Sequence, residues 1–74
     1  MIPINQISIG DIFQNPMFKN GLLFVVEDIN KPEKMIKVQP HDFEKCQPFG
    51  PPMWKSNKDR MFRESWSYYK NEIS

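Results

Sequence analysis

The sequence predicts one small domain that is mainly β with a single C-terminal helix, an α+β fold class. Three observations support this prediction. Two strand-like apolar runs, at 22–29 and 34–39, flank a short polar turn. The apolar spacing changes to a helical period after residue 56. A chain of 74 residues is long enough for one domain and short for two.

The first strand is expected at 11–15, directly after Gly10. Ile12 and Phe13 are apolar and adjacent, as in a strand that contacts a core. Gly10 can adopt a positive φ without a Cβ penalty, so it suits a tight turn or a bulge at the start of this strand. Asn20 and Gly21 then give a turn signal before the next strand.

The strongest pattern in the chain is a hairpin over 22–39. Its first strand, 22–29, is apolar on both faces until it reaches Glu27 and Asp28, as in a strand with one buried and one solvated end. Residues 30–33 form the turn. In the second strand, Ile36 and Val38 alternate with Lys37, which predicts a half-exposed strand that ends near Pro40. We expect this hairpin to organise the domain.

The C-terminal part is expected to form a helix over about 57–70. Ser56 and Asp59 have the spacing of an N-terminal capping pair. Phe62, Trp66 and Tyr69 follow at i, i+4 and i+7, so they share one helical face, which we expect to pack on the sheet. The preceding segment, 47–52, contains three prolines and is expected to be a loop.

Composition and charge restrict the class of protein. Ten basic and nine acidic residues give a net charge of +1, which argues against a strong polyanion-binding surface and against a simple acidic mimic of DNA. The single cysteine, Cys46, excludes a disulfide within the chain. The sequence lacks a signal-peptide pattern and a long apolar run, so we expect a soluble cytoplasmic protein. Its small size makes a homodimer a reasonable expectation.

The residue types that support catalysis or metal binding are sparse. His41, Asp42, Glu44 and Cys46 form a polar segment whose spacing fits no structural zinc pattern and no activated nucleophile. The three glycines are isolated, so no phosphate-binding loop is expected. The sequence therefore predicts a non-enzymatic protein without catalytic residues, metal or cofactor.

Two binding functions remain. The first is nucleic-acid binding by a small β-barrel, in which aromatic side chains stack on bases beside a basic groove. The residues that could build such a surface follow the proline segment: Trp54, Lys55, Lys58, Arg60 and Arg63. Asp59 and Glu64 dilute the positive charge, and this function therefore ranks second.

The second is protein binding, for which 14–18 is the candidate segment. Gln14, Met17 and Phe18 resemble the bacterial sliding-clamp-binding pentapeptide, in which a Gln is followed after two residues by a bulky aliphatic and then Phe or Leu. In such a segment the Gln amide reaches a polar ledge and the apolar pair fills a preformed pocket. A core role for Met17 and Phe18 at one end of the barrel is the competing interpretation.

Several segments together resemble small SH3-like barrels, in which a Gly-Asp pair enters the first strand and a central hairpin carries the core. These segments are 9–13, 23–29, 35–38, 54–56 and 62–66. The resemblance implies a partly open SH3-like barrel. Chains of this size and style are common among small bacteriophage proteins, and through 14–18 the chain also resembles the staphylococcal phage inhibitors of the host DNA sliding clamp.

That resemblance implies a function in the bacterial cytoplasm: inhibition of a host protein, most concretely the DNA sliding clamp, and thereby of DNA replication. Inhibition would proceed by filling the peptide pocket of the clamp or by obstructing its DNA channel. In the second case an acidic face would meet a basic channel. The residues that could build this face are Glu27, Asp28, Glu33, Asp42 and Glu44.

Overall fold

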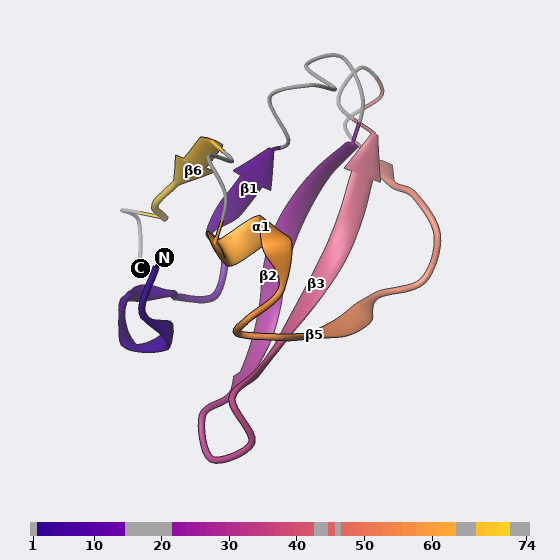
Figure 1. Cartoon of the computed structure of the whole chain (residues 1–74). Helices are drawn as coiled ribbons and strands as arrows, with labels where there is room; N and C mark the ends of the chain where they lie inside the picture. Colours follow the sequence, from indigo (N-terminus) through magenta and orange to yellow (C-terminus); the bar gives the residue numbers. More distant parts are fainter. Residues whose placement is uncertain (1, 15–21, 43–44, 46, 64–66, 72–74) are drawn as a thin grey trace.

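The computed structural model describes residues 2–14, 22–42, 45, 47–63 and 67–71, which form a mainly β protein (Figure 1). The elements in chain order are η1 (Ile4–Gln6), β1 (Ile12–Gln14), β2 (Leu22–Asn30), β3 (Met35–Asp42), β4 (Gln47–Pro48), β5 (Met53–Ser56), α1 (Arg60–Arg63) and β6 (Ser67–Tyr69).

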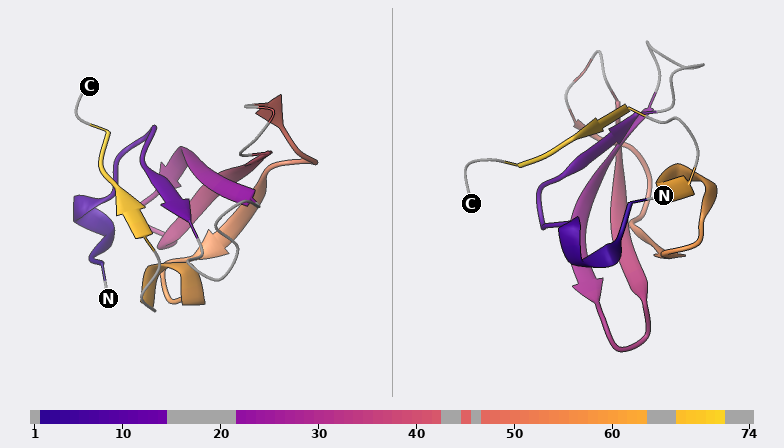
Figure 2. Two further views of the ribbon diagram at one scale, coloured as in Figure 1. Left: turned by 90° about the horizontal axis from the view of Figure 1, so that it is seen from above. Right: turned by 60° about the vertical axis from the view of Figure 1, so that its left-hand side comes forward.

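All strands belong to one antiparallel sheet. Its order is β4-β3-β2-β1-β6, and β5 pairs with the other end of β3. The pairings of the described strands do not join β5 to β6, so the sheet is not closed. A sheet of this size confirms the predicted mainly β fold class. The sheet curves around the side on which α1 lies (Figure 2).

The predicted hairpin is present as β2 and β3. The pairing of the two strands shifts between Val26 and Asp28, so Glu27 is the extra residue of a β-bulge. Lys31–Lys34 make the turn, with the Lys34 N–H donating to the Lys31 carbonyl at 3.1 Å. As predicted, Ile36 and Val38 are fully buried whereas Lys37 is half-buried.

The second strand of the hairpin is longer than predicted, because it continues through Pro40 to Asp42. The Pro40 carbonyl accepts a hydrogen bond from the Phe49 N–H at 2.8 Å, and it therefore points away from β2. In a strand the N–H of a residue points to the same side as its carbonyl, so the missing N–H of Pro40 does not interrupt the β2–β3 ladder.

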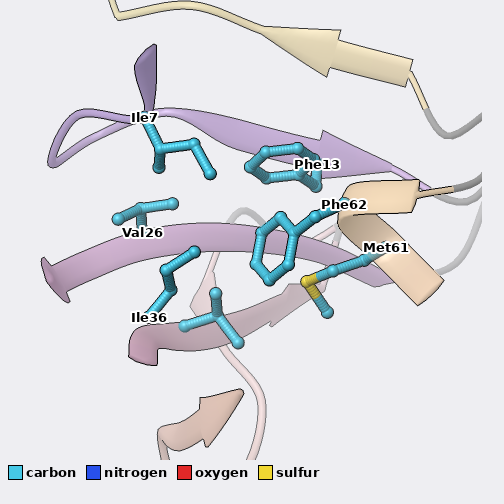
Figure 3. Packing of buried hydrophobic residues seen from close by; sticks show 7 residues of the cluster. Ile7, Phe13, Val26, Ile36, Met61 and Phe62 are labelled. Atoms are coloured by element: carbon cyan, nitrogen blue, oxygen red, sulfur yellow. The ribbon is translucent and has the colours of Figure 1, made fainter. Parts of the chain in front are cut away.

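The core lies between the sheet and α1 (Figure 3). Phe13 is at its centre: its ring meets Phe62 edge to face, with centroids 4.9 Å apart, and stacks on Tyr68 at 4.8 Å. The buried hydrophobic residues are Ile7, Phe13, Val26, Ile36, Val38, Met61 and Phe62. Strands β1, β2 and β3 thus share one buried face.

The predicted helix over 57–70 is wrong in its extent, because α1 covers four residues, Arg60–Arg63. Asp59, rather than Ser56, caps its start: the Met61 N–H donates to Asp59 Oδ1 at 3.2 Å. Ser56 instead accepts a hydrogen bond from the Lys58 N–H in the preceding turn.

The segment that was expected to end the helix is strand β6, paired with β1. Tyr69 is 53% exposed and Tyr68 packs against the core, which reverses the roles that helical spacing assigned. Trp66 lies outside the described residues. Aromatic side chains favour a strand, and β1 offers an edge for pairing, so a long-range contact overrides the local period.

Candidate functional site

A buried carboxylate fixes the C-terminal strand against the start of the chain. Asp11 is 0% exposed, and its Oδ2 accepts hydrogen bonds from the Ser8 N–H at 2.8 Å and the Tyr68 hydroxyl at 2.7 Å. Its Oδ1 accepts from the Asn71 N–H at 2.7 Å, and Lys70 Nζ lies 3.5 Å from Oδ2. We call these five residues the Asp11 cluster.

The electrostatics of the Asp11 cluster favour one protonation state. Burial alone would raise the pKa of Asp11, but the hydrogen bonds from Asn71, Ser8 and Tyr68, together with the charge of Lys70, lower it below 3.8 overall. Burial raises the pKa of Tyr68, and its hydrogen bond to Asp11 raises it further. Asp11 is therefore an anion at neutral pH, and Tyr68 is a neutral donor.

Lys70 and Asn71 extend the Asp11 cluster to η1 and the following turn. Lys70 Nζ donates to the Gln6 carbonyl and, at 2.8 Å, to Ser8 Oγ. The Asn71 side chain donates to the Ile9 carbonyl at 3.0 Å. These contacts hold the end of β6 in place beside β1, and they thereby determine which side chains of β6 reach the opposite face of the sheet.

That opposite face is the candidate binding site. Phe13, Phe24 and Tyr68 point to the core, so their neighbours along β1, β2 and β6 point away from it, because side chains alternate along a strand. The register places these neighbours in two rows, Tyr69–Ile12–Val25 and Ser67–Gln14–Leu23. We call these six residues the outer face.

Four of the six outer-face side chains are apolar and none is charged, although 26% of the chain is charged. Tyr69 is largely exposed, and Ile12, Leu23 and Val25 are half-buried. At β3 the next side chain in the first row is Gln39, which is 7% exposed. Its amide donates to the Gly50 carbonyl at 2.8 Å, so the proline-rich loop bounds the outer face on this side.

Of the predicted clamp-binding residues, the structure places one. Gln14 is the last residue of β1 and lies on the outer face, paired with Leu23 on one side and Ser67 on the other. Met17 and Phe18 fall outside the described residues. Gln14 is therefore the one residue of the predicted segment that the structure describes.

Of the residues predicted for an acidic face, those that the structure describes are spread along the β2–β3 hairpin. Glu27 and Asp28 are exposed at the bulge, and Glu33 lies in the hairpin turn. Asp42 is at the opposite end of β3, about 23 Å from that turn at the usual rise per strand residue. Glu44 lies outside the described residues. The hairpin is extended, so Glu33 and Asp42 lie at opposite ends of β3.

The predicted nucleic-acid residues are divided between two faces. Trp54 is 45% exposed and pairs with Lys37, whereas Lys55 pairs with the buried Ile36 and is therefore on the core side. Lys55 Nζ lies 3.8 Å from Asp59 Oδ2, a weak and half-exposed ion pair. Lys58 and Arg60 are exposed, and Arg63 is the last residue of α1.

The described part of the chain contains no group of three or more His, Cys, Asp or Glu side chains that could hold a metal ion. His41 is half-buried in β3, and Cys46 lies outside the described residues. Among the described helices, none has the length and apolar character needed to cross a membrane. Comparison of the chain with family models, curated proteins and solved structures found no match in any of the three.

Sequence reasoning missed four apolar residues of the outer face: Ile12, Leu23, Val25 and Tyr69. The signal was present in β1, where Phe13 lies between Ile12 and Gln14 and only one of two adjacent apolar residues can face a core. At β6 the signal was hidden, because Tyr68 and Tyr69 fit a helical and an alternating pattern equally well.

Proposed function

We propose that this protein is a non-enzymatic binding module that docks on another protein through the outer face. The supporting observation is the row Tyr69–Ile12–Val25, an uncharged apolar strip with a largely exposed tyrosine at its end. Interface centres are depleted in charged residues and enriched in Tyr. A tyrosine also gives a large rigid contact area together with a polar tip.

The bacterial DNA sliding clamp is the most concrete partner. This choice rests on the resemblance of 14–18 to the clamp-binding pentapeptide, and Gln14 on the outer face is compatible with it. The strand order β6-β1-β2-β3-β5, with a short helix between β5 and β6, is compatible with a partly open SH3-like barrel. The corresponding function is inhibition of DNA replication by a bacteriophage protein in the host cytoplasm.

The direct test is titration of purified bacterial sliding clamp with the protein in an isothermal calorimeter. Tyr69→Ala should weaken binding about tenfold, because truncation of a tyrosine that anchors an interface costs about 1.4 kcal/mol or more. Phe49→Ala is the matched control, since Phe49 is equally exposed, at 58%, but is not part of the outer face. Equal affinities for the two variants would place the interface elsewhere.

The pentapeptide is tested separately with the double variant Gln14→Ala and Phe18→Ala. Loss of clamp binding with an unchanged melting temperature would support a role of 14–18 in the pocket of the clamp. Normal binding by this variant would exclude the segment. A melting temperature that falls by several degrees would instead assign these residues to the fold.

A small nucleic-acid-binding β-barrel is the second candidate function. The observation in its favour is the exposed Trp54 beside Lys37. The dependence of affinity on salt concentration distinguishes the two candidate functions. Nucleic-acid binding releases counterions, so its affinity falls steeply as the salt concentration rises, whereas the affinity of an apolar protein interface changes far less.

A further inference from the structure

Most of the described basic side chains gather at one end of the molecule. Apart from Lys45 and Lys70, every lysine or arginine whose side chain the structure describes lies on the β2–β3 hairpin, on β5, in the turn after β5 or at the first residue of α1. These residues, which we call the basic end, are Lys31, Lys34, Lys37, Lys55, Lys58 and Arg60.

Backbone contacts bring the parts of the basic end together. The Asn57 N–H donates to the Lys34 carbonyl at 3.0 Å, which joins the hairpin turn to the turn after β5. Along the paired strands, Lys37 is opposite Trp54. The hairpin turn and the turn after β5 are therefore neighbours, whereas α1 lies farther from the hairpin turn in Figure 1.

Lys34 occupies a position that normally favours glycine or asparagine. Its φ is 55°, and it is the one non-glycine residue with a positive φ in the described part of the chain. A side chain in this region strains the backbone. Residues held in such conformations tend to mark functional sites. A glycine would fit this position with less strain, and Lys34 instead places an exposed charge in the turn.

Trp54 supplies the aromatic component. It is on the same side of the sheet as Lys37, away from the core, and nearly half of it is exposed. An indole ring offers a flat surface on which a base can stack, and stacking is tolerant of sequence. A cation close to a stacked base also lies close to the phosphates on either side of that base.

We propose that the basic end binds single-stranded nucleic acid, with Trp54 stacking on a base and Lys34 and Lys37 contacting the flanking phosphates. This inference locates the second candidate function and is independent of clamp binding. The exposed Trp54 favours nucleic acid over an acidic protein. Four acidic side chains lie close by: Glu27 at the bulge, Asp28 opposite Lys37, Glu33 in the turn and Asp59 beside Lys55. They limit the net positive charge, so binding should be weak and strongly dependent on salt.

The test uses fluorescence anisotropy with a labelled oligothymidylate of about 15 nucleotides, a length near the upper site size of single-strand binding folds. Wild-type protein should bind at about 50 mM salt and lose most of its affinity at about 200 mM. Trp54→Ala should weaken binding about tenfold. Lys34→Gly should weaken binding several-fold and leave the melting temperature unchanged or higher, because glycine relieves the backbone strain.

The controls are Lys45→Gly, which removes a lysine outside the basic end, and Phe49→Ala, which removes an exposed aromatic ring. Both should bind oligothymidylate like the wild type. If the wild type binds oligothymidylate and Trp54→Ala and Lys34→Gly bind it equally well, the inference is overturned. The second candidate function would then remain, with its surface elsewhere. Absence of wild-type binding would overturn both. Equal competition by polyglutamate would identify a surface that accepts any polyanion, and that result also contradicts the proposed stacking.

Discussion

At the scale of single residues, Asp11 shows how a buried charge is made tolerable. Three hydrogen bonds and the neighbouring Lys70 surround its carboxylate, so the charge is fully partnered within the described structure. An unpartnered buried carboxylate would instead be protonated or would destabilise the fold. The Asp11 cluster is thus a structural anchor, and its stability contribution depends on pH.

Asp11 should stabilise the fold above about pH 4 and lose that contribution in acid. Its pKa is lowered by folding from 3.8, so the carboxylate contributes fully above the unfolded value and progressively less as the pH falls through the folded value. Asp11→Asn should reduce the free energy of unfolding by about 1.5–3 kcal/mol at pH 7. Urea denaturation at pH 7 and pH 3 measures the free energy of unfolding of the wild type and of the variant. The difference between the two proteins should be smaller at pH 3 than at pH 7. A difference that is independent of pH would contradict this account.

Two glycines with positive φ give a matched pair for a second prediction. Gly10 has φ 92° and a Cβ there would collide with the Asn71 side chain, whereas Gly50 has φ 82° and open space around it. Gly50→Ala should cost about 1 kcal/mol for backbone strain alone. Gly10→Ala should cost clearly more, about 2–3 kcal/mol. Thermal unfolding of both variants shows which one loses more stability. Equal losses of stability would mean that the Asn71 side chain moves aside without cost.

At the scale of elements, the hairpin could be predicted and the helix could not. Ile36 and Val38 alternate with Lys37, and alternation of this kind depends on near neighbours alone. The end of the chain depends on distant partners: Tyr68 stacks on Phe13 and donates to Asp11, 57 residues earlier. Helical spacing of Phe62 and Tyr69 contains no trace of these contacts, so the local pattern gave the wrong element.

As with the fold, only part of the candidate site could be predicted from the sequence. Gln14 was identified from a motif and does lie on the outer face. Helical spacing predicts Tyr69 in the core, and the structure places it on the outer face. Its orientation depends on the pairing of β6 with β1, which the Asp11 cluster holds in place and which the local sequence does not contain. The basic end also depends on folding, since the Lys34 and Asn57 backbones meet across 23 residues.

At the scale of the whole molecule, small size remains the dominant constraint. Seven hydrophobic residues form the buried cluster of the described structure. A chain of 74 residues is near the lower limit at which a domain buries enough apolar surface to fold alone. Such chains often gain stability from a second copy, and a net charge of +1 gives two copies little reason to repel each other. We therefore propose that the protein forms a homodimer.

Sedimentation equilibrium tests the homodimer over a wide range of protein concentration. The expected result is a mass that approaches twice the 8.9 kDa of one chain as the concentration rises. The melting temperature should rise with concentration as well, because association stabilises the folded state by mass action. A constant mass of 8.9 kDa at all concentrations would contradict the proposal.

The Asp11 cluster also has a consequence for how the chain is made. Asp11 leaves the ribosome early, but Tyr68 and Asn71, which complete its hydrogen bonds, follow 57 and 60 residues later. Until they emerge, the carboxylate has to remain hydrated and β1 lacks its pairing with β6. Contacts between such distant residues form late and slow the folding of small domains. Final folding of this domain should therefore wait until Asn71 has been made, and chains released before residue 68 should be targets for proteolysis.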